Sequence, residues 1–205
     1  MGTGLASTSG EADDGRTMTA IRAIVACLLT VALLEFATTP LVVADEVSDR
    51  VTLDRLFAEL KAAPDAAVAH DISQRIWIYW TTPADTELAM RMGELLAARR
   101  VSDLDRALAL ADALITDHPD YAEAWNQRAT LHYMRGDLDA SLADCAEVLV
   151  REPRHYGALS GRSLIYLQQG QRALALRDMA AAVEIHPFLS ERRLFPELQQ
   201  EMTRI

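Results

Sequence analysis

The sequence predicts an all-α protein made of three consecutive helical pairs. Alanine and leucine are abundant and aromatic residues make up only 6% of the chain, which favours helices over sheets. Gly136 and Gly170 are 34 residues apart, and Pro153 and Pro187 repeat this interval. A glycine inside a helix costs about 1 kcal/mol relative to alanine, whereas a glycine between two helices can form the turn. The shared interval therefore indicates a repeated helix–turn–helix.

The interval defines three units, at residues 88–121, 122–155 and 156–189. In each unit an apolar helical stripe is followed by a turn residue, a second helix and a proline. The turn residues are Ser102, Gly136 and Gly170, and the prolines are Pro119, Pro153 and Pro187. We expect each proline to start the next helix, where no hydrogen bond is lost through its missing N–H. A single unit cannot bury its apolar face alone, so such a stack needs a cap at both ends.

Residues 45–87 are predicted to form an N-terminal helical cap, and residues 190–205 a C-terminal capping segment. A first helix over Val51–Ala62 places its large apolar residues on one face, namely Leu53, Leu56, Phe57 and Leu60. A second helix over residues 66–80 does the same with Ile72, Ile76, Trp77 and Trp80. We expect this pair to cover the first unit. Pro196 to Arg204 is predicted as a short amphipathic helix at the other end.

The N-terminal region has the composition of an export signal. Residues 1–17 are polar and acidic, and we expect them to precede the true start at Met18. Residues 18–44 combine Arg22, an apolar run over residues 23–34 and an ending of Val–Val–Ala that suits a signal peptidase. This segment is therefore predicted to be a signal peptide.

Cleavage is predicted after Ala44, which would release the protein into the periplasm. The alternative is an uncleaved anchor in the inner membrane, since residues 23–44 are long enough to span a bilayer. Glu35 opposes that alternative because a carboxylate is costly inside a membrane.

The middle unit resembles the tetratricopeptide repeat (TPR), a helix–turn–helix with a period of 34 residues. The residues that fall on characteristic family positions are Trp125, Ala129, Gly136, Ser141 and Pro153. The third unit has Leu159 in place of the tryptophan, and the first unit, which departs furthest, has Arg91 there. The resemblance implies a right-handed α-solenoid that binds other proteins. An N-terminal pair ahead of three repeats also resembles small TPR proteins exported by alphaproteobacteria.

In TPR stacks the first helix of each unit lines a concave groove. The resemblance places these partner-binding residues there: Met92, Asn126, Thr130, Tyr133, Met134, Leu164, Leu167 and Gln168. Apolar, aromatic and amide side chains together suit an extended or helical peptide with apolar anchors. The alternative is that some of them pack against the N-terminal pair or the C-terminal tail. The lysine and asparagine pattern with which some TPR proteins clamp a peptide carboxylate is not present at these positions, so that function is not expected.

No catalytic or metal-binding motif occurs in the sequence, which predicts a non-enzymatic protein without a cofactor. His118 and His186 share one position of the repeat, which favours a structural role at a helix end. Cys145 is expected to be a buried, inert thiol, and Glu191 with the two following arginines a solvated helix end. The net charge of −10 argues against a nucleic-acid partner. A protein or peptide partner remains, with membrane contact only through the signal or anchor segment. We therefore expect a periplasmic adaptor, and the alternative is an assembly factor that is anchored in the inner membrane with its repeats in the periplasm.

Overall fold

The computed structural model describes residues 39–201, and side chains from residue 50 to residue 198. The predicted leader and most of the predicted signal segment lie outside these residues. The chain divides into a compact unit that ends at Thr52 and a second that begins at Leu53, and each is considered by itself. Within the described residues, none of the helices combines the length and the apolar character needed to cross a membrane.

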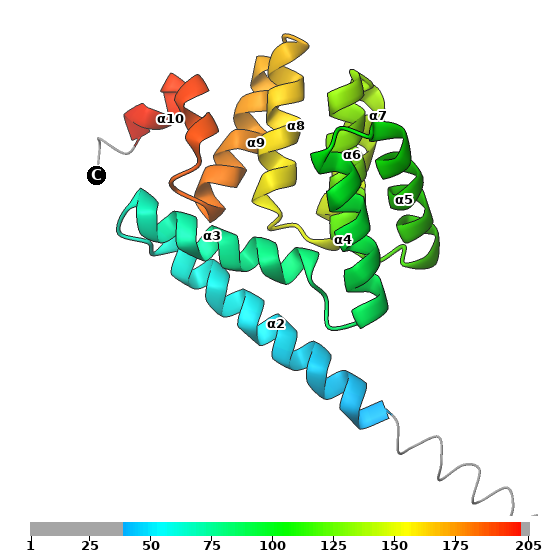
Figure 1. Ribbon diagram of the computed structural model, residues 1–205. Coiled ribbons are helices and arrows are strands. Elements are labelled where there is room, and N and C mark those ends of the chain that lie inside the picture. The colour runs from blue at the N-terminus through cyan, green and yellow to red at the C-terminus, as the bar shows by residue number, and fades with distance from the viewer. Residues whose placement is uncertain (1–38, 202–205) are drawn as a thin grey trace, which may run out of the picture. The chain divides into compact units, whose positions relative to one another are not determined.

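Three helical hairpins follow one another in the part of the chain that begins at Leu53, as the repeat interval predicts (Figure 1). Their helices are α4 (Thr86–Arg100) with α5 (Leu104–Asp117), α6 (Ala122–Arg135) with α7 (Leu138–Arg151), and α8 (Tyr156–Gln168) with α9 (Arg172–Ile185). From α4 to α9, each helix packs on the next one along the chain. The predicted all-α solenoid is confirmed, and residues 39–201 contain no strand.

The turn inside each hairpin contains one residue with a positive φ, at Ser102 (60°), Gly136 (84°) and Gly170 (72°). The N–H group of the following residue donates to a carbonyl five residues earlier. These bonds run from Asp103 to Ala98, from Asp137 to His132 and from Gln171 to Tyr166. They are typical of a Schellman helix end, which glycine adopts without steric cost. Ser102 adopts the same conformation with a Cβ atom, at a cost of about 1–2 kcal/mol.

The prolines between the hairpins do not begin the helices, so that prediction is wrong. Pro119, Pro153 and Pro187 each hold the second position of a four-residue turn. The N–H groups that close these turns are those of Tyr121, His155 and Leu189. They donate to the main-chain carbonyls of His118, Glu152 and His186, respectively. Proline suits the second position because its ring fixes φ near −65°. Pro196 does begin a helix, α10 (Pro196–Glu201).

Small residues bring the two helices of a hairpin close together, as expected. The hydroxyl of Ser141 in α7 donates to the carbonyl of Ala129 in α6 at 2.7 Å. One repeat later the roles are exchanged, because Ser163 in α8 donates to the carbonyl of Ala175 in α9 at 2.7 Å. All four residues are buried. Each hydroxyl therefore finds its hydrogen-bond acceptor inside the core.

The N-terminal pair consists of the end of α2 (Thr39–Lys61) and α3 (Ala66–Thr81), which Asp65 caps by accepting from two N–H groups at 2.9 Å. Its core contains Leu53, Leu56, Phe57, Leu60, Ala69, Ile72 and Ile76. Trp77 was expected in this core, but its side chain is 41% exposed. The reason is that Trp77 lies one position, about 100°, past Ile76 on the helix.

The N-terminal pair packs on the third hairpin instead of covering the first. Tyr156 at the start of α8, and Ile185 and Phe188 around the end of α9, extend its core. The Tyr121 hydroxyl, in the turn before α6, donates to the Trp80 carbonyl. With 16 residues, α3 is about 24 Å long and can therefore reach the ends of two successive hairpins. This long-range contact is not visible in a local sequence pattern.

A short 3-10 helix, η1 (Ser190–Leu194), and α10 follow the third hairpin. Phe195 between them is fully buried against Ala175 and Met179. The last hairpin is thus covered by one inserted aromatic ring. The end of the predicted amphipathic helix, with Met202, lies outside the described residues.

Candidate functional site

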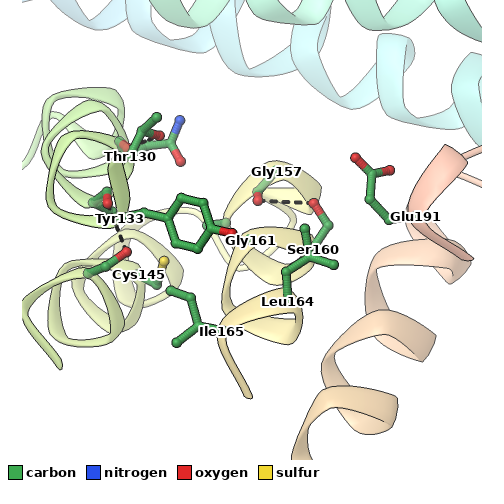
Figure 2. A pocket seen from close by; sticks show the side chains of 13 residues that line it. Thr130, Tyr133, Cys145, Gly157, Ser160, Gly161, Leu164, Ile165 and Glu191 are labelled. Carbon is green, nitrogen blue, oxygen red and sulfur yellow. Dashed lines mark hydrogen bonds between the residues drawn. The ribbon is translucent and has the colours of Figure 1, made fainter. Parts of the chain in front are cut away.

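A pocket of about 230 Å³ lies between the second and third hairpins, and we call it the α6–α8 pocket (Figure 2). Its walls are formed by Asn126, Thr130 and Tyr133 of α6 and by Gly157, Ser160, Gly161 and Leu164 of α8. Cys145 of α7 and Ile165 of α8 also line it. In Figure 2 the Tyr133 ring extends from α6 toward Gly161, and Glu191 of η1 stands on the opposite side of α8.

Three residues of the α8 wall have little or no side chain. Gly157, Ser160 and Gly161 have the i, i+3, i+4 spacing that places residues on one face of a helix. Among the described residues, a Cβ atom at Gly161 would meet no heavy atom within 4 Å beyond its chain neighbours and the backbone of its own helix. Packing against the described residues therefore does not require a glycine there, although glycine weakens the helix by about 1 kcal/mol relative to alanine. Its effect is to keep the pocket open.

The polar groups of the walls are left mainly as hydrogen-bond acceptors. Thr130 donates its hydroxyl proton to the Asn126 carbonyl at 3.0 Å, and Ser160 donates to the Gly157 carbonyl at 3.2 Å. The Asn126 Nδ2 atom lies 3.2 Å from both carboxylate oxygens of Glu123. This contact assigns the amide nitrogen to the Glu123 side and leaves Oδ1 of Asn126 to accept from another group. A bound molecule would therefore meet oxygens with free lone pairs.

Glu191 adds a carboxylate to the pocket. Ser190 donates to one of its oxygens at 3.1 Å, and no lysine or arginine within residues 50–198 forms a salt bridge with it. The two arginines that follow it point elsewhere: Arg192 lies over the Phe188 ring at 5.8 Å, and Arg193 donates to the Ser190 carbonyl at 3.1 Å. The interpretation of Glu191 as part of a solvated helix end is therefore wrong, because this residue is half-buried and lines the pocket.

Behind the α6 wall, Glu123 belongs to a buried network that joins α6 to α8. His155 accepts from the N–H of Ala158 through Nδ1 at 3.0 Å, so its Nε2 carries the proton and donates to Glu123 at 3.0 Å. Gln127 also donates to Glu123 and accepts from Arg99 of α4. Glu123 and His155 are each 2% exposed. The network satisfies a buried carboxylate and holds the two walls of the pocket at a fixed separation.

Two buried ion pairs recur at the repeat interval and join the helices of each hairpin. Arg128 of α6 donates twice to Asp144 of α7, at 2.8 and 2.7 Å. Arg162 of α8 donates to Asp178 of α9 at 2.5 Å. Hydrogen bonding to Asp144 raises the pKa of the Arg128 guanidinium, despite partial burial. Sequence reasoning missed these pairs, although arginine and aspartate at matching repeat positions were a usable signal.

Cys145 is 3% exposed, so its predicted burial is confirmed. Burial raises the pKa of its thiol to about 11. The thiol is therefore protonated at neutral pH and is a poor nucleophile. Its sulfur contributes to the lining of the pocket as an apolar atom (Figure 2).

The structure brings part of the predicted partner-binding set together at the pocket: Asn126, Thr130, Tyr133 and Leu164. Met134 and Gln168 are exposed but do not line it. Leu167 packs on the cluster around Phe195, which matches the alternative of packing near the C-terminal end. Met92 is wrong as a contact residue, because it has no exposed surface and lies in the core shared by α4, α5 and α6.

Sequence reasoning missed Gly161 and Glu191 as pocket residues. Gly161 carried a signal, since it follows Gly157 at helical spacing on the predicted groove side. Glu191 carried none, because its position depends on how the chain turns after Pro187.

No group of three or more histidine, cysteine or acidic side chains in the described part of the chain is placed to hold a metal ion. No family model matches the chain. It is 35% identical over 140 residues to a TPR repeat-containing protein of Rhizobium etli. The aligned residues make up 68% of this chain and 69% of that protein. The chain belongs to the TPR repeat proteins.

Two further proteins are similar to this TPR protein. A BBSome complex member BBS4 homolog of Drosophila melanogaster is 27% identical over 96 residues, which are 47% of this chain but only 19% of that protein. The crystal structure of MamA superposes with a TM-score of 0.45 and 19% identity, over 65% of this chain and 75% of MamA.

Proposed function

We propose that this TPR protein is a non-enzymatic adaptor that binds another protein at the α6–α8 pocket. Family membership supports an interaction role. The proposed position of the binding site is supported by the pocket itself, where four of the predicted contact residues meet. Tyr133 is 45% exposed on its wall, and an exposed tyrosine beside a pocket is a typical anchor of protein interfaces.

The chemistry of the pocket suits binding better than catalysis. Its thiol is held in the protonated form, and its hydroxyl protons are already donated to helix carbonyls. Among residues 50–198, the hydrogen bonds of the Thr130 and Ser160 hydroxyls go to main-chain carbonyls and not to a basic side chain, which nucleophilic catalysis would require.

The test is affinity capture after crosslinking in cells, with Tyr133→Ala compared with Val150→Ala. Val150 is a matched control because it is 77% exposed, apolar and outside the pocket, on α7. We expect the Tyr133 variant to remain helical by circular dichroism and to lose the captured partner, while the Val150 variant retains it. Unchanged capture by a folded Tyr133→Ala protein would place the interface outside the pocket, first at the arginines of residues 151–205, a segment with 8 basic and 6 acidic residues.

Export to the periplasm, with cleavage after Ala44, is the second part of the proposal. The supporting observation is the pattern of Arg22, the apolar run and the Val–Val–Ala ending. Cleavage there would remove only the first residues of α2, which begins at Thr39, and would leave intact the compact unit that begins at Leu53. Mass spectrometry of a periplasmic extract should find an N-terminus at Asp45. Recovery of the uncleaved chain in the membrane pellet would favour the inner-membrane anchor.

A further inference from the structure

We infer that the α6–α8 pocket accepts one large apolar side chain of a partner segment, flanked in that segment by lysine or arginine. The inference rests on the proposed adaptor function and specifies the chemistry of the partner. It follows from the size of the pocket, the atoms that line it and the charge of Glu191.

The size of the pocket favours a single side chain over a small molecule. Its volume of about 230 Å³ is below the roughly 300–1,000 Å³ of pockets that enclose drug-sized ligands. Leu164, Ile165, Cys145 and the Tyr133 ring provide apolar contacts. Across from the ring, Gly161 leaves open space where any other residue would place a side chain. An aromatic or leucine side chain inserted there would be held between α6 and α8.

The electrostatics favour a cationic neighbour for that side chain. Glu191 lacks a salt bridge with any lysine or arginine among residues 50–198, and the wall oxygens of Asn126, Thr130 and Ser160 remain acceptors. A segment that brings ammonium or guanidinium donors would satisfy them. After the proposed cleavage, residues 45–205 still carry a net charge of −8, with 18 basic and 26 acidic residues, which adds a longer-range attraction for a basic partner.

The test is an NMR titration that follows the methyl signals of Leu164 and Ile165 in the full-length protein. Three nine-residue peptides with blocked ends and glycine–serine flanks are compared, with the centres arginine–phenylalanine–arginine, arginine–alanine–arginine and glutamate–phenylalanine–glutamate. We expect the first peptide to bind. The second should bind at least about tenfold more weakly, because it lacks the apolar side chain. The third should bind several-fold more weakly than the first because of charge repulsion.

Two variants with matched controls connect this preference to the pocket. Gly161→Leu should fill the pocket and abolish the shifts, whereas Gly93→Leu should not, although Gly93 is an exposed helical glycine with the same open surroundings. Glu191→Gln should reduce the difference between the arginine and glutamate peptides at least twofold. Glu94→Gln, an exposed acidic residue on α4, should leave that difference unchanged.

Equal binding of the phenylalanine and alanine peptides, or undiminished binding to Gly161→Leu, would overturn the inference. If crosslinking still captures a partner in a Tyr133-dependent manner, the adaptor function would survive that failure.

The residues after Glu201 also combine arginine with apolar side chains. If this tail occupied the pocket, Arg204→Glu would weaken its binding there and the peptide would bind more tightly. That result would overturn the inference that the pocket accepts a segment of another protein.

Discussion

The indole ring of Trp80 lies almost parallel to the imidazole ring of His155, with 4.0 Å between ring centroids and 9° between planes. His155 caps α8 through Nδ1 and donates to Glu123 through Nε2. A residue of α3 therefore packs directly on the network behind the α6–α8 pocket. The N-terminal pair therefore contacts this network in addition to covering apolar surface of the third hairpin.

Replacement of Trp80 should destabilise the protein strongly. Trp80→Ala removes the stack on His155 and contacts with Phe57 and Tyr156, so we expect a loss of about 2–4 kcal/mol in the free energy of unfolding. Trp77→Ala is the control, because this tryptophan of the same helix is 41% exposed and should cost less than about 1 kcal/mol. Urea unfolding measures both. Equal losses would show that the stack contributes nothing specific.

Two glycine substitutions should have opposite effects on stability. Gly136 has a φ of 84°, so Gly136→Ala should cost about 1–2 kcal/mol through strain in the left-handed conformation. Gly161 is helical and its added Cβ would meet no other described part of the chain within 4 Å, so Gly161→Ala should stabilise by up to about 1 kcal/mol. Thermal unfolding of the two proteins should show shifts of opposite sign. A destabilised Gly161→Ala would mean that the α8 wall is more crowded than the structure indicates.

Breaking a buried ion pair should cost more than breaking an exposed one. Arg128→Met leaves Asp144, which is 4% exposed, without its bidentate partner, and we expect a loss of about 3–5 kcal/mol. Arg135→Met breaks a pair with Asp105, whose side chain is 91% exposed, and should cost less than about 1 kcal/mol. Denaturant unfolding compares the two. The double variant Arg128→Met/Asp144→Leu should recover most of the loss, and a lack of recovery would contradict the explanation by an unpaired charge.

The three hairpins could be predicted because their turns depend on local chemistry. Gly136 and Gly170 occupy left-handed positions that few other residues tolerate, so their interval fixes the hairpins. The role of Pro153 was misassigned because a fixed φ suits both the first turn of a helix and the second position of a β-turn.

The candidate site was predicted only in part. The groove positions of α6 followed from the resemblance to TPR proteins, as Tyr133 shows. Met92 failed because burial depends on which neighbouring helices cover a position. Glu191 and the contact of Trp80 with His155 depend on tertiary packing of segments far apart in the sequence, which periodicity does not encode.

The thiol of Cys145 should make stability depend on pH above neutrality. Burial raises its pKa from 9.0 to about 11, so the folded state retains a proton that the unfolded state releases between these values. The contribution of the thiol to the free energy of unfolding is therefore fully present below pH 9. It is lost as the pH rises through about 11, by about 2–3 kcal/mol. Cys145→Ala removes this contribution while all other titrating groups remain. Its free energy of unfolding should therefore fall less steeply over this interval than that of the parent protein in urea unfolding at each pH. Parallel curves for the two proteins would mean that the thiol ionises equally well in the folded state, and hence that water reaches the bottom of the α6–α8 pocket.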